Sequence, residues 1–417
     1  MIKSELAARF IDMFTKHPLV RNFSFFASGN LISKAILYLV NAYLARIFSP
    51  EHFGQIVFAQ TILLFGMIVT DSIRWLAIRD VAYTEGSRQE EIVKETWATM
   101  LVLGGLSWLS ITLIAIGFND STEQVLILLF AFVIPVSVLN VDWFLKGLQR
   151  FKSVGLAEVF KSLFYLCALV VFVRNPGKLL YVPLAYLLGW LIAAGYIFFT
   201  IRHNISRILP KFNLSRFRKL FQAGLPIIFN GFMVQFYLNS GIFFLKIFSD
   251  PYTIGLYGAV LKLTLLATLF SALFGETLLP TMTARYAISE LHGWSLTSKI
   301  LWILGGIGLL VTVIFVGFAG FILHLVYGSQ YVAAVFVFQI SALSITPYFL
   351  YVPIMNLLVI KHLEQRLFWA SLLGVLFNCI FNLLLVPTLG ALGAAITITL
   401  THVVVVVSAA LFIMRAN

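Results

Sequence analysis

Charged residues are scarce in this chain: Asp, Glu, Lys and Arg make up only 11% of its 417 residues, and the mean hydropathy is +0.97. Soluble globular domains carry about 25% charged residues, so the composition excludes a soluble protein. Cysteine is also scarce, because only Cys167 and Cys379 occur, each in apolar sequence typical of inert thiols. No HExxH spacing and no GxxxxGK[ST] phosphate loop occurs, so we expect no metal site, no cofactor and no ATP hydrolysis by the chain itself.

The first 21 residues lack the unbroken apolar core of a signal peptide. Charged side chains interrupt the segment throughout, so we expect residues 1–21 to form an amphipathic helix on the membrane surface rather than a cleaved leader. The interrupting residues are Lys3, Glu5, Arg9, Asp12, Lys16 and Arg21.

Long apolar stretches recur from one end of the chain to the other. About 20 apolar residues are enough to span a bilayer as a helix, so the sequence predicts an all-α polytopic membrane protein. We expect twelve transmembrane helices, at residues 22–47, 54–78, 96–118, 124–146, 156–174, 179–202, 221–247, 254–283, 299–325, 332–360, 367–387 and 390–414.

The basic residues divide unevenly between the loops that these helices leave. With the N-terminus in the cytoplasm, 21 of the 29 Lys and Arg residues lie on the cytoplasmic side, whereas the opposite loops hold only Arg174 and Lys178. Cytoplasmic loops retain positive charge, so we predict that both termini are cytoplasmic. The net charge of +12 is then mainly a topology signal, and a nucleic-acid partner is not expected.

A short motif is repeated 200 residues apart, as RIFS at 46–49 and KIFS at 246–249. Each copy ends a long apolar stretch, which indicates two homologous halves in one membrane domain. We predict a six-helix bundle at 22–202, a basic cytoplasmic linker at 203–220 and a second six-helix bundle at 221–417.

Charge inside the bilayer is costly and normally faces a bundle interior or a hydrated cavity. The deeper charged groups fall on the first, second, seventh and eighth predicted helices, and at 100° per residue the polar groups of each helix lie within about 40–60° of one another. Four such stripes would face a cavity between the halves, with more cations than anions. The stripes contain Asn30, Lys34 and Asn41; Gln60, Asp71 and Arg74; Gln235, Asn239 and Lys246; and Lys262 and Glu276.

Several of these groups also have a purely structural interpretation. Asp71 and Arg74, like Glu158 and Lys161, are spaced i, i+3 and could form local ion pairs. Arg46 lies about 160° from Asn30 on the helical wheel and could instead reach the outer headgroups. Asn378 and Asn382 are expected to form hydrogen bonds to a neighbouring helix. His402 is expected to be a structural histidine packed in the core, although a histidine in a span could also bind a proton. Lys34 has no carboxylate partner in its own helix.

The chain resembles the Wzx-type polysaccharide flippases of the multidrug/oligosaccharidyl-lipid/polysaccharide superfamily. The resemblance lies in the twelve helices, in the 200-residue repeat and in the turn IFSPEHFG at 47–54, which has a weaker copy at 247–255. The sequence PTLG at 387–390, before the small residues 391–395, is similar to the usual start of the last helix in that family.

The resemblance implies two six-helix bundles around a central cavity that opens alternately to the two faces of the bacterial inner membrane. Such proteins move oligosaccharides linked to undecaprenyl pyrophosphate, and related members couple transport to an H⁺ or Na⁺ gradient. Lys34 and Lys262 are then the main candidates for attracting the pyrophosphate, with Arg74, Lys246 and Arg46 secondary. The Asn and Gln side chains of the stripes would bond sugar hydroxyls, and Asp71 or Glu276 would bind the coupling ion. Partners would include a polysaccharide polymerase and a chain-length regulator.

Two alternatives stay open. A multidrug or metabolite cation antiporter of the same fold should have an acid-rich cavity, which Lys34 and Lys262 argue against. An intramembrane polymerase, ligase or acyltransferase acting on lipid-linked sugars would need catalytic groups near one face and usually a large outer loop. The predicted outer loops are all short, so we expect a transporter and not an enzyme.

Overall fold

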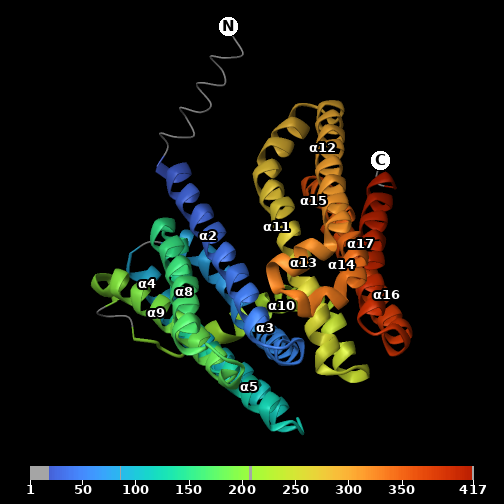
Figure 1. Cartoon of the computed structure of the whole chain (residues 1–417). Helices are drawn as coiled ribbons and strands as arrows, with labels where there is room; N and C mark the ends of the chain where they lie inside the picture. The colour runs from blue at the N-terminus through green and yellow to red at the C-terminus, as the bar shows by residue number, and fades with distance from the viewer. Residues whose placement is uncertain (1–17, 85, 206–208, 416–417) are drawn as a thin grey trace. The chain divides into compact units, whose positions relative to one another are not determined.

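In the computed structural model, residues 18–84, 86–205 and 209–415 are described, and every regular element among them is helical (Figure 1). Nearly all of the predicted amphipathic segment 1–21 lies outside these residues. The elements are α2 (Pro18–Ile47), α3 (Pro50–Ala82), α4 (Ser87–Ile116), α5 (Ser121–Ala131), α6 (Val133–Leu139), α7 (Asp142–Gly147), α8 (Phe151–Phe172), η1 (Pro176–Lys178), α9 (Tyr181–Ile205), α10 (Leu214–Phe248), α11 (Pro251–Ile288), α12 (Glu290–Gly317), α13 (Ala319–Tyr327), η2 (Ser329–Ala334), α14 (Val335–Ala342), α15 (Ile345–Ile360), α16 (Glu364–Leu389) and α17 (Ala391–Met414).

Eleven stretches of the described chain are long and apolar enough to cross a membrane, which confirms the all-α polytopic fold. The predicted span 22–47 falls within α2, which is not among the eleven, so the count of twelve stays a prediction. Three predicted spans are interrupted in the structure: 124–146 is divided into α5, α6 and α7, 299–325 includes the break between α12 and α13, and 332–360 is divided into η2, α14 and α15.

The chain packs into two compact units, each of which is discontinuous in sequence. Unit 1 consists of Met1–Val40 and Ile62–Gly231, and unit 2 consists of Asn41–Thr61 and Phe232–Asn417. The helices α2, α3 and α10 therefore contribute residues to both units. The turn between α2 and α3, which holds the first copy of the repeated motif, packs with the C-terminal half of the chain.

Within unit 2, α3 and α11 cross at their first turns with almost no space between their backbones. A Cβ added to Gly54 would lie 2.1 Å from the carbonyl oxygen of Pro251, and one added to Gly255 would lie 1.7 Å from that of Pro50. Only glycine permits this approach. The repeated turn ends in glycine in both halves. These two glycines therefore fix where α3 of the first half crosses α11 of the second half.

Buried amide and hydroxyl groups join α10, α16 and α17 in unit 2. Asn378 donates to Thr401 Oγ1 at 3.0 Å, Ser240 donates to Asn378 Oδ1, and Asn382 donates to Ser240 Oγ at 3.2 Å. Helices in a bilayer gain little from excluding water, so contacts of this kind stabilise helix packing. The predicted structural role of Asn378 and Asn382 is confirmed.

Unit 1 is held mainly by a core rich in tryptophan and aliphatic residues. Trp97 and Trp143 are buried in this core, and the indole Nε1 of Trp97 donates to the carbonyl of Val138 at 3.1 Å. This bond ties α4 to the last turn of α6. The end of α6 is therefore anchored directly before the chain leaves the helix at Asn140.

Candidate functional site

In unit 1 the guanidinium of Arg74 is held between two elements. It donates to Asp71 Oδ1 at 3.0 Å within α3 and to the carbonyl of Ser137 in α6. Arg74 is 13% exposed, whereas Asp71 is 49% exposed. The predicted local ion pair is therefore present, and Asp71 is its more exposed member.

Two further ion pairs lie in the same unit. Lys146 and Asp142 approach to 2.5 Å in α7, and Lys161 and Glu158 to 2.6 Å in α8. The Lys161 ammonium also lies 4.3 Å from the ring centroid of Trp190. Since each cation has an anion, the three pairs of unit 1 are electrically neutral. The structural interpretation of Glu158 and Lys161 fits this geometry.

In unit 2, the cation Lys262 is held by an amide instead of a carboxylate. The ammonium of Lys262 in α11 donates to the side-chain oxygen of Gln60 in α3 at 3.1 Å. The two residues lie about two turns beyond Gly255 and Gly54, so the glycine crossing places them opposite each other. Among the side chains that the structure describes, no carboxylate pairs with Lys262. Its charge is solvated by an amide but not neutralised.

The predicted groups of the α10 stripe have partners on α3 and along α10 itself. Lys246 lies 5.3 Å from the ring centroid of Phe58 on α3, a cation–π contact that helical spacing alone could not predict. Along α10, Asn239 donates to Gln235 Oε1 at 3.0 Å. This amide pair lies about two to three turns from Lys246 and leaves further donors and acceptors for a polar ligand.

Arg46 has a defined structural partner. Its Nε donates to the carbonyl of Val326 at 3.1 Å, and its Nη2 donates to that of Leu325. These carbonyls end α13, where a cation complements the helix dipole. Gln330 reinforces the contact by donating to the carbonyls of Ala45 at 2.5 Å and Phe48 at 3.1 Å. The donors of Arg46 are therefore engaged in unit 2, and its binding role stays a prediction.

The remaining predicted residues are distributed over both units. Lys34 is exposed on the unit 1 part of α2, and the described residues offer it no hydrogen bond or ion pair. Asn30 is partly buried one turn before it, and Asn41 belongs to unit 2. Glu276 lies in α11, but its side chain is outside what the structure describes. Hence no acidic partner is found among the described side chains for either Lys34 or Lys262.

His402 is a core residue of unit 2. Its Nδ1 lies 3.0 Å from the carbonyl of Ile398, and its ring packs against Tyr237 and Tyr348 at centroid distances of 6.0 and 5.5 Å. The structural interpretation fits this environment. The charged groups within the spans of unit 1 are paired, apart from Lys34, while unit 2 holds Lys262 beside an amide and Lys246 beside an aromatic ring. Lys262 can therefore attract an anion without first breaking an ion pair with a described side chain.

The chain matches one protein family and is similar to curated proteins along most of its length. A family model described as "Polysaccharide biosynthesis protein" matches residues 19–286. The capsular polysaccharide biosynthesis protein CapF of Staphylococcus aureus is 21% identical over 94% of this chain and 98% of its own length. A provisionally named O-antigen transporter of Shigella dysenteriae is 22% identical over 91% of this chain and 95% of its own.

Solved structures share the fold along nearly the whole chain. The lipid II flippase MurJ in an inward closed conformation superposes with a TM-score of 0.74 at 13% identity, covering 93% of this chain and 87% of MurJ. An inward-facing multidrug resistance MATE family transporter of the MOP superfamily gives 0.73 at 14% identity, covering 96% and 98%. The predicted MOP-type fold is confirmed by these superpositions.

Proposed function

Because the chain belongs to the polysaccharide biosynthesis protein family, we propose that it is a flippase that moves an oligosaccharide linked to undecaprenyl pyrophosphate across the bacterial inner membrane. The names of the two relatives and the fold shared with a lipid II flippase support this activity. Transport proceeds by alternating access in this proposal. The substrate would be an O-antigen or similar polysaccharide repeat unit.

The observation that carries the proposal is the state of Lys262. A lysine within a membrane span has a cost that proteins accept for function, and here its only described polar partner is the neutral amide of Gln60. A pyrophosphate supplies the missing negative charge, while amides such as those of Gln235 and Asn239 can bond sugar hydroxyls. Lys34 is the matching cation of unit 1.

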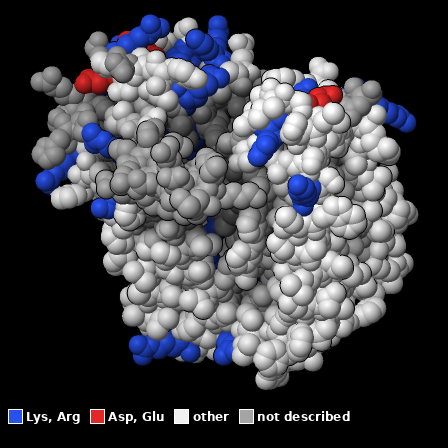
Figure 2. Space-filling model, turned by 90° about the horizontal axis from the view of Figure 1, so that it is seen from above, with Lys and Arg blue, Asp and Glu red and all other residues white. Residues whose placement is uncertain are grey.

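We also propose an orientation and a coupling ion site. Both termini are cytoplasmic in this proposal, which the excess of basic over acidic side chains on the face seen in Figure 2 supports. Asp71 or Glu276 binds the coupling ion, H⁺ or Na⁺, in this proposal, and Asp71 is half-exposed beside a buried arginine. A polysaccharide polymerase and a chain-length regulator are the expected partners of the export step.

The decisive test is complementation of a deletion strain, with surface polysaccharide as the readout and membrane insertion measured in parallel. Lys34→Ala or Lys262→Ala should abolish surface polysaccharide, and the corresponding Arg variants should keep part of it. Lys299→Ala removes an exposed lysine of unit 2 and serves as the control. Full polysaccharide in both Ala variants would remove these lysines from the mechanism.

Purified protein in vesicles then tests the reaction itself. Lipid-linked oligosaccharide should reach the outer leaflet without change in chain length. Lengthening of the chain would establish an enzyme instead, and efflux of a cationic dye would favour an antiporter like the multidrug transporter that shares the fold.

A further inference from the structure

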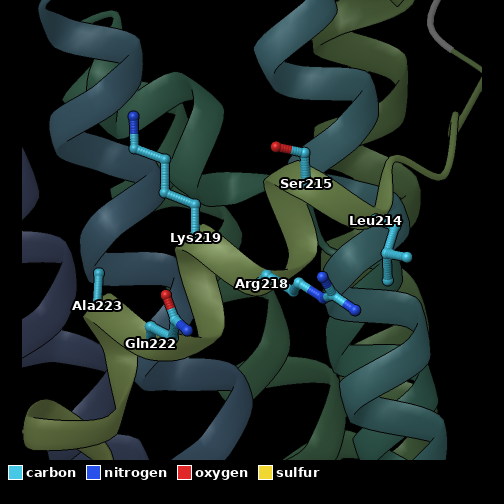
Figure 3. A pocket seen from close by; sticks show the side chains of 6 residues that line it. All are labelled: Leu214, Ser215, Arg218, Lys219, Gln222 and Ala223. Carbon is cyan, nitrogen blue, oxygen red and sulfur yellow. The ribbon is translucent and has the colours of Figure 1, made fainter.

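Three adjoining hollows surround the start of α10 in unit 1. The largest, about 820 Å³, is lined by residues 214–223 of α10, among them Arg218, Lys219 and Gln222 (Figure 3). A second hollow of about 330 Å³ extends to the end of α3 and the start of α4, and a third of about 320 Å³ extends to the start of α4. Both include Arg88 and Lys219. Lys219 lines all three hollows, which are together called the basic groove.

The acidic residues of this groove already have partners. Asp80 accepts from Arg79 at 3.1 Å and from Arg216 at 2.7 Å. Glu95 accepts from Asn213 Nδ2 at 2.5 Å, and Glu91 lies 4.0 Å from Lys211. The largest hollow has no acidic residue among its described lining residues.

Three cations of the groove have no acidic partner among the described residues. Arg88, Arg218 and Lys219 are exposed, and none of them forms an ion pair or a side-chain hydrogen bond with a described residue. Arg218 and Lys219 extend from α10 in different directions in Figure 3, with Ser215 and Gln222 one turn to either side. The first amides of α10 are already capped by Asn213 at 3.0 and 3.3 Å, so the cations carry the charge of the site.

We infer that this groove binds the diphosphate of the lipid-linked substrate, together with its first sugar, before the substrate enters the membrane path. Three unpaired cations suit a group with more than one negative charge, and arginine engages phosphate oxygens in pairs. A hollow of about 820 Å³ is within the range of ligand sites and exceeds what one phosphate needs. Ser215 and Gln222 are placed to bond sugar hydroxyls.

The position of the groove gives it a role distinct from that of Lys262. It belongs to unit 1 at the beginning of α10, ahead of the apolar part of that helix, whereas Lys262 lies within a span of unit 2. In the proposed topology the groove faces the cytoplasmic headgroups, where lipid-linked sugars are made. This inference rests on the proposed function and adds a capture site to it.

Binding is measured on the full-length protein in nanodiscs of neutral lipid, with a short-chain polyprenyl diphosphate as the probe. The double variant R218Q/K219Q should raise the dissociation constant about tenfold, the effect of losing two exposed charge contacts. The control R285Q/K299Q removes the same charge from exposed positions in unit 2 and should bind like the wild type. Equal binding by R218Q/K219Q and wild type, or equal loss in the control, would overturn the site.

Two further probes identify the source of the phosphate. Inorganic pyrophosphate should bind at least tenfold more weakly than the lipid-borne diphosphate, since it lacks the membrane-held chain. Phosphatidylglycerol added at equal charge should not displace the probe. Equal affinity for free pyrophosphate, or full displacement by phosphatidylglycerol, would contradict a substrate site.

Transport separates this inference from the proposed function. In vesicles, R218Q/K219Q should raise the KM for lipid-linked oligosaccharide and leave the maximal rate unchanged. A wild-type protein that binds the diphosphate but moves no oligosaccharide would refute the function while retaining the site. Normal transport with an unchanged KM in R218Q/K219Q would refute the site while retaining the function.

Discussion

Unit 1 and unit 2 differ in how they hold the charged side chains within their predicted spans. Unit 1 pairs Arg74, Lys146 and Lys161 each with a carboxylate three or four residues away on the same helix. Unit 2 leaves Lys262 beside the neutral amide of Gln60, and sets Lys246 against an aromatic ring. Paired charges cost little to keep but are already satisfied, whereas an unpaired cation stays available to an anionic ligand.

The two units also differ in how closely their helices approach at glycine. We expect Gly255→Ala to have the largest effect on stability, because its Cβ would lie 1.7 Å from a backbone oxygen that cannot move alone. The loss should be about 4 kcal/mol, enough to prevent accumulation of the protein. In unit 1, a Cβ on Gly155 would lie 3.0 Å from the carbonyl of Phe25.

Gly155→Ala should therefore cost about 1 kcal/mol or less, since alanine also favours the helix by about that amount. Membrane accumulation and the melting temperature of purified protein measure both variants. Similar behaviour of the two would show that close approach does not distinguish the α3–α11 crossing from the α2–α8 crossing.

Breaking the Glu158–Lys161 ion pair of unit 1 should test directly how the two units differ in the pairing of their charges. Glu158→Ala leaves the Lys161 ammonium buried without its anion and should destabilise the protein by about 3 kcal/mol. The double variant E158M/K161M should recover most of that loss. Lys262→Met leaves no unpaired ion behind and should be close to neutral in the same thermal melt. If Lys262→Met is as destabilising as Glu158→Ala, the contrast between the units is wrong.

Converting unit 2 to the pattern of unit 1 should reduce transport. Gln60→Glu places a carboxylate beside the Lys262 ammonium, which then competes with the substrate anion. We expect transport to fall about tenfold, equivalent to about 1.4 kcal/mol, with no loss of stability. Gln60→Ala is the control and should fall much less. Higher transport in Gln60→Glu would mean that the lysine positions a helix rather than a ligand.

A small effect is expected at the helix caps. Asp250 caps α11 in unit 2 by accepting from the Thr253 amide at 2.7 Å, and Asp120 caps α5 in unit 1 by accepting from the Thr122 amide at 2.8 Å. Either Asp→Ala change should cost about 1 kcal/mol at neutral pH. A melting temperature that is unchanged in both variants would contradict this.

The cap at Asp250 also sets a pH dependence. Hydrogen bonds from Thr253 hold the pKa of the Asp250 carboxyl below its ordinary value of 3.8. A lowered pKa means that the cap contributes fully above the ordinary value and is lost as the pH falls through the lowered one. The stability difference between wild type and Asp250→Ala should therefore vanish only in strong acid.

Local spacing accounts for what the sequence predicted well. The pairs Asp71–Arg74 and Glu158–Lys161 lie one turn apart on a helix, and Asn378 and Asn382 share one helix face, so their contacts follow from helix geometry. The apolar runs likewise predicted the helices, since length and hydropathy decide whether a segment can span a bilayer.

Contacts between distant residues could not be predicted in this way. Lys262 and Gln60 are 202 positions apart, and Arg46 reaches carbonyls 279 and 280 positions away. The repeat indicated related halves, but it could not show that residues 41–61 pack with residues 232–417. Such contacts depend on which helices cross one another, and helix crossings cannot be predicted from the spacing of residues in a single sequence.

Because residues 41–61 pack with residues 232–417, the order in which the protein can be synthesised and folded is constrained. The turn between α2 and α3 is synthesised within the first 61 residues, yet the groups that contact it are Gly255, Leu325 and Gln330. The first pair of helices must therefore wait in the bilayer, with the turn at Pro50 unpacked, until most of the chain has been inserted. A chain that ends after the first predicted bundle, at residue 202, therefore lacks the described groups that pack against this turn.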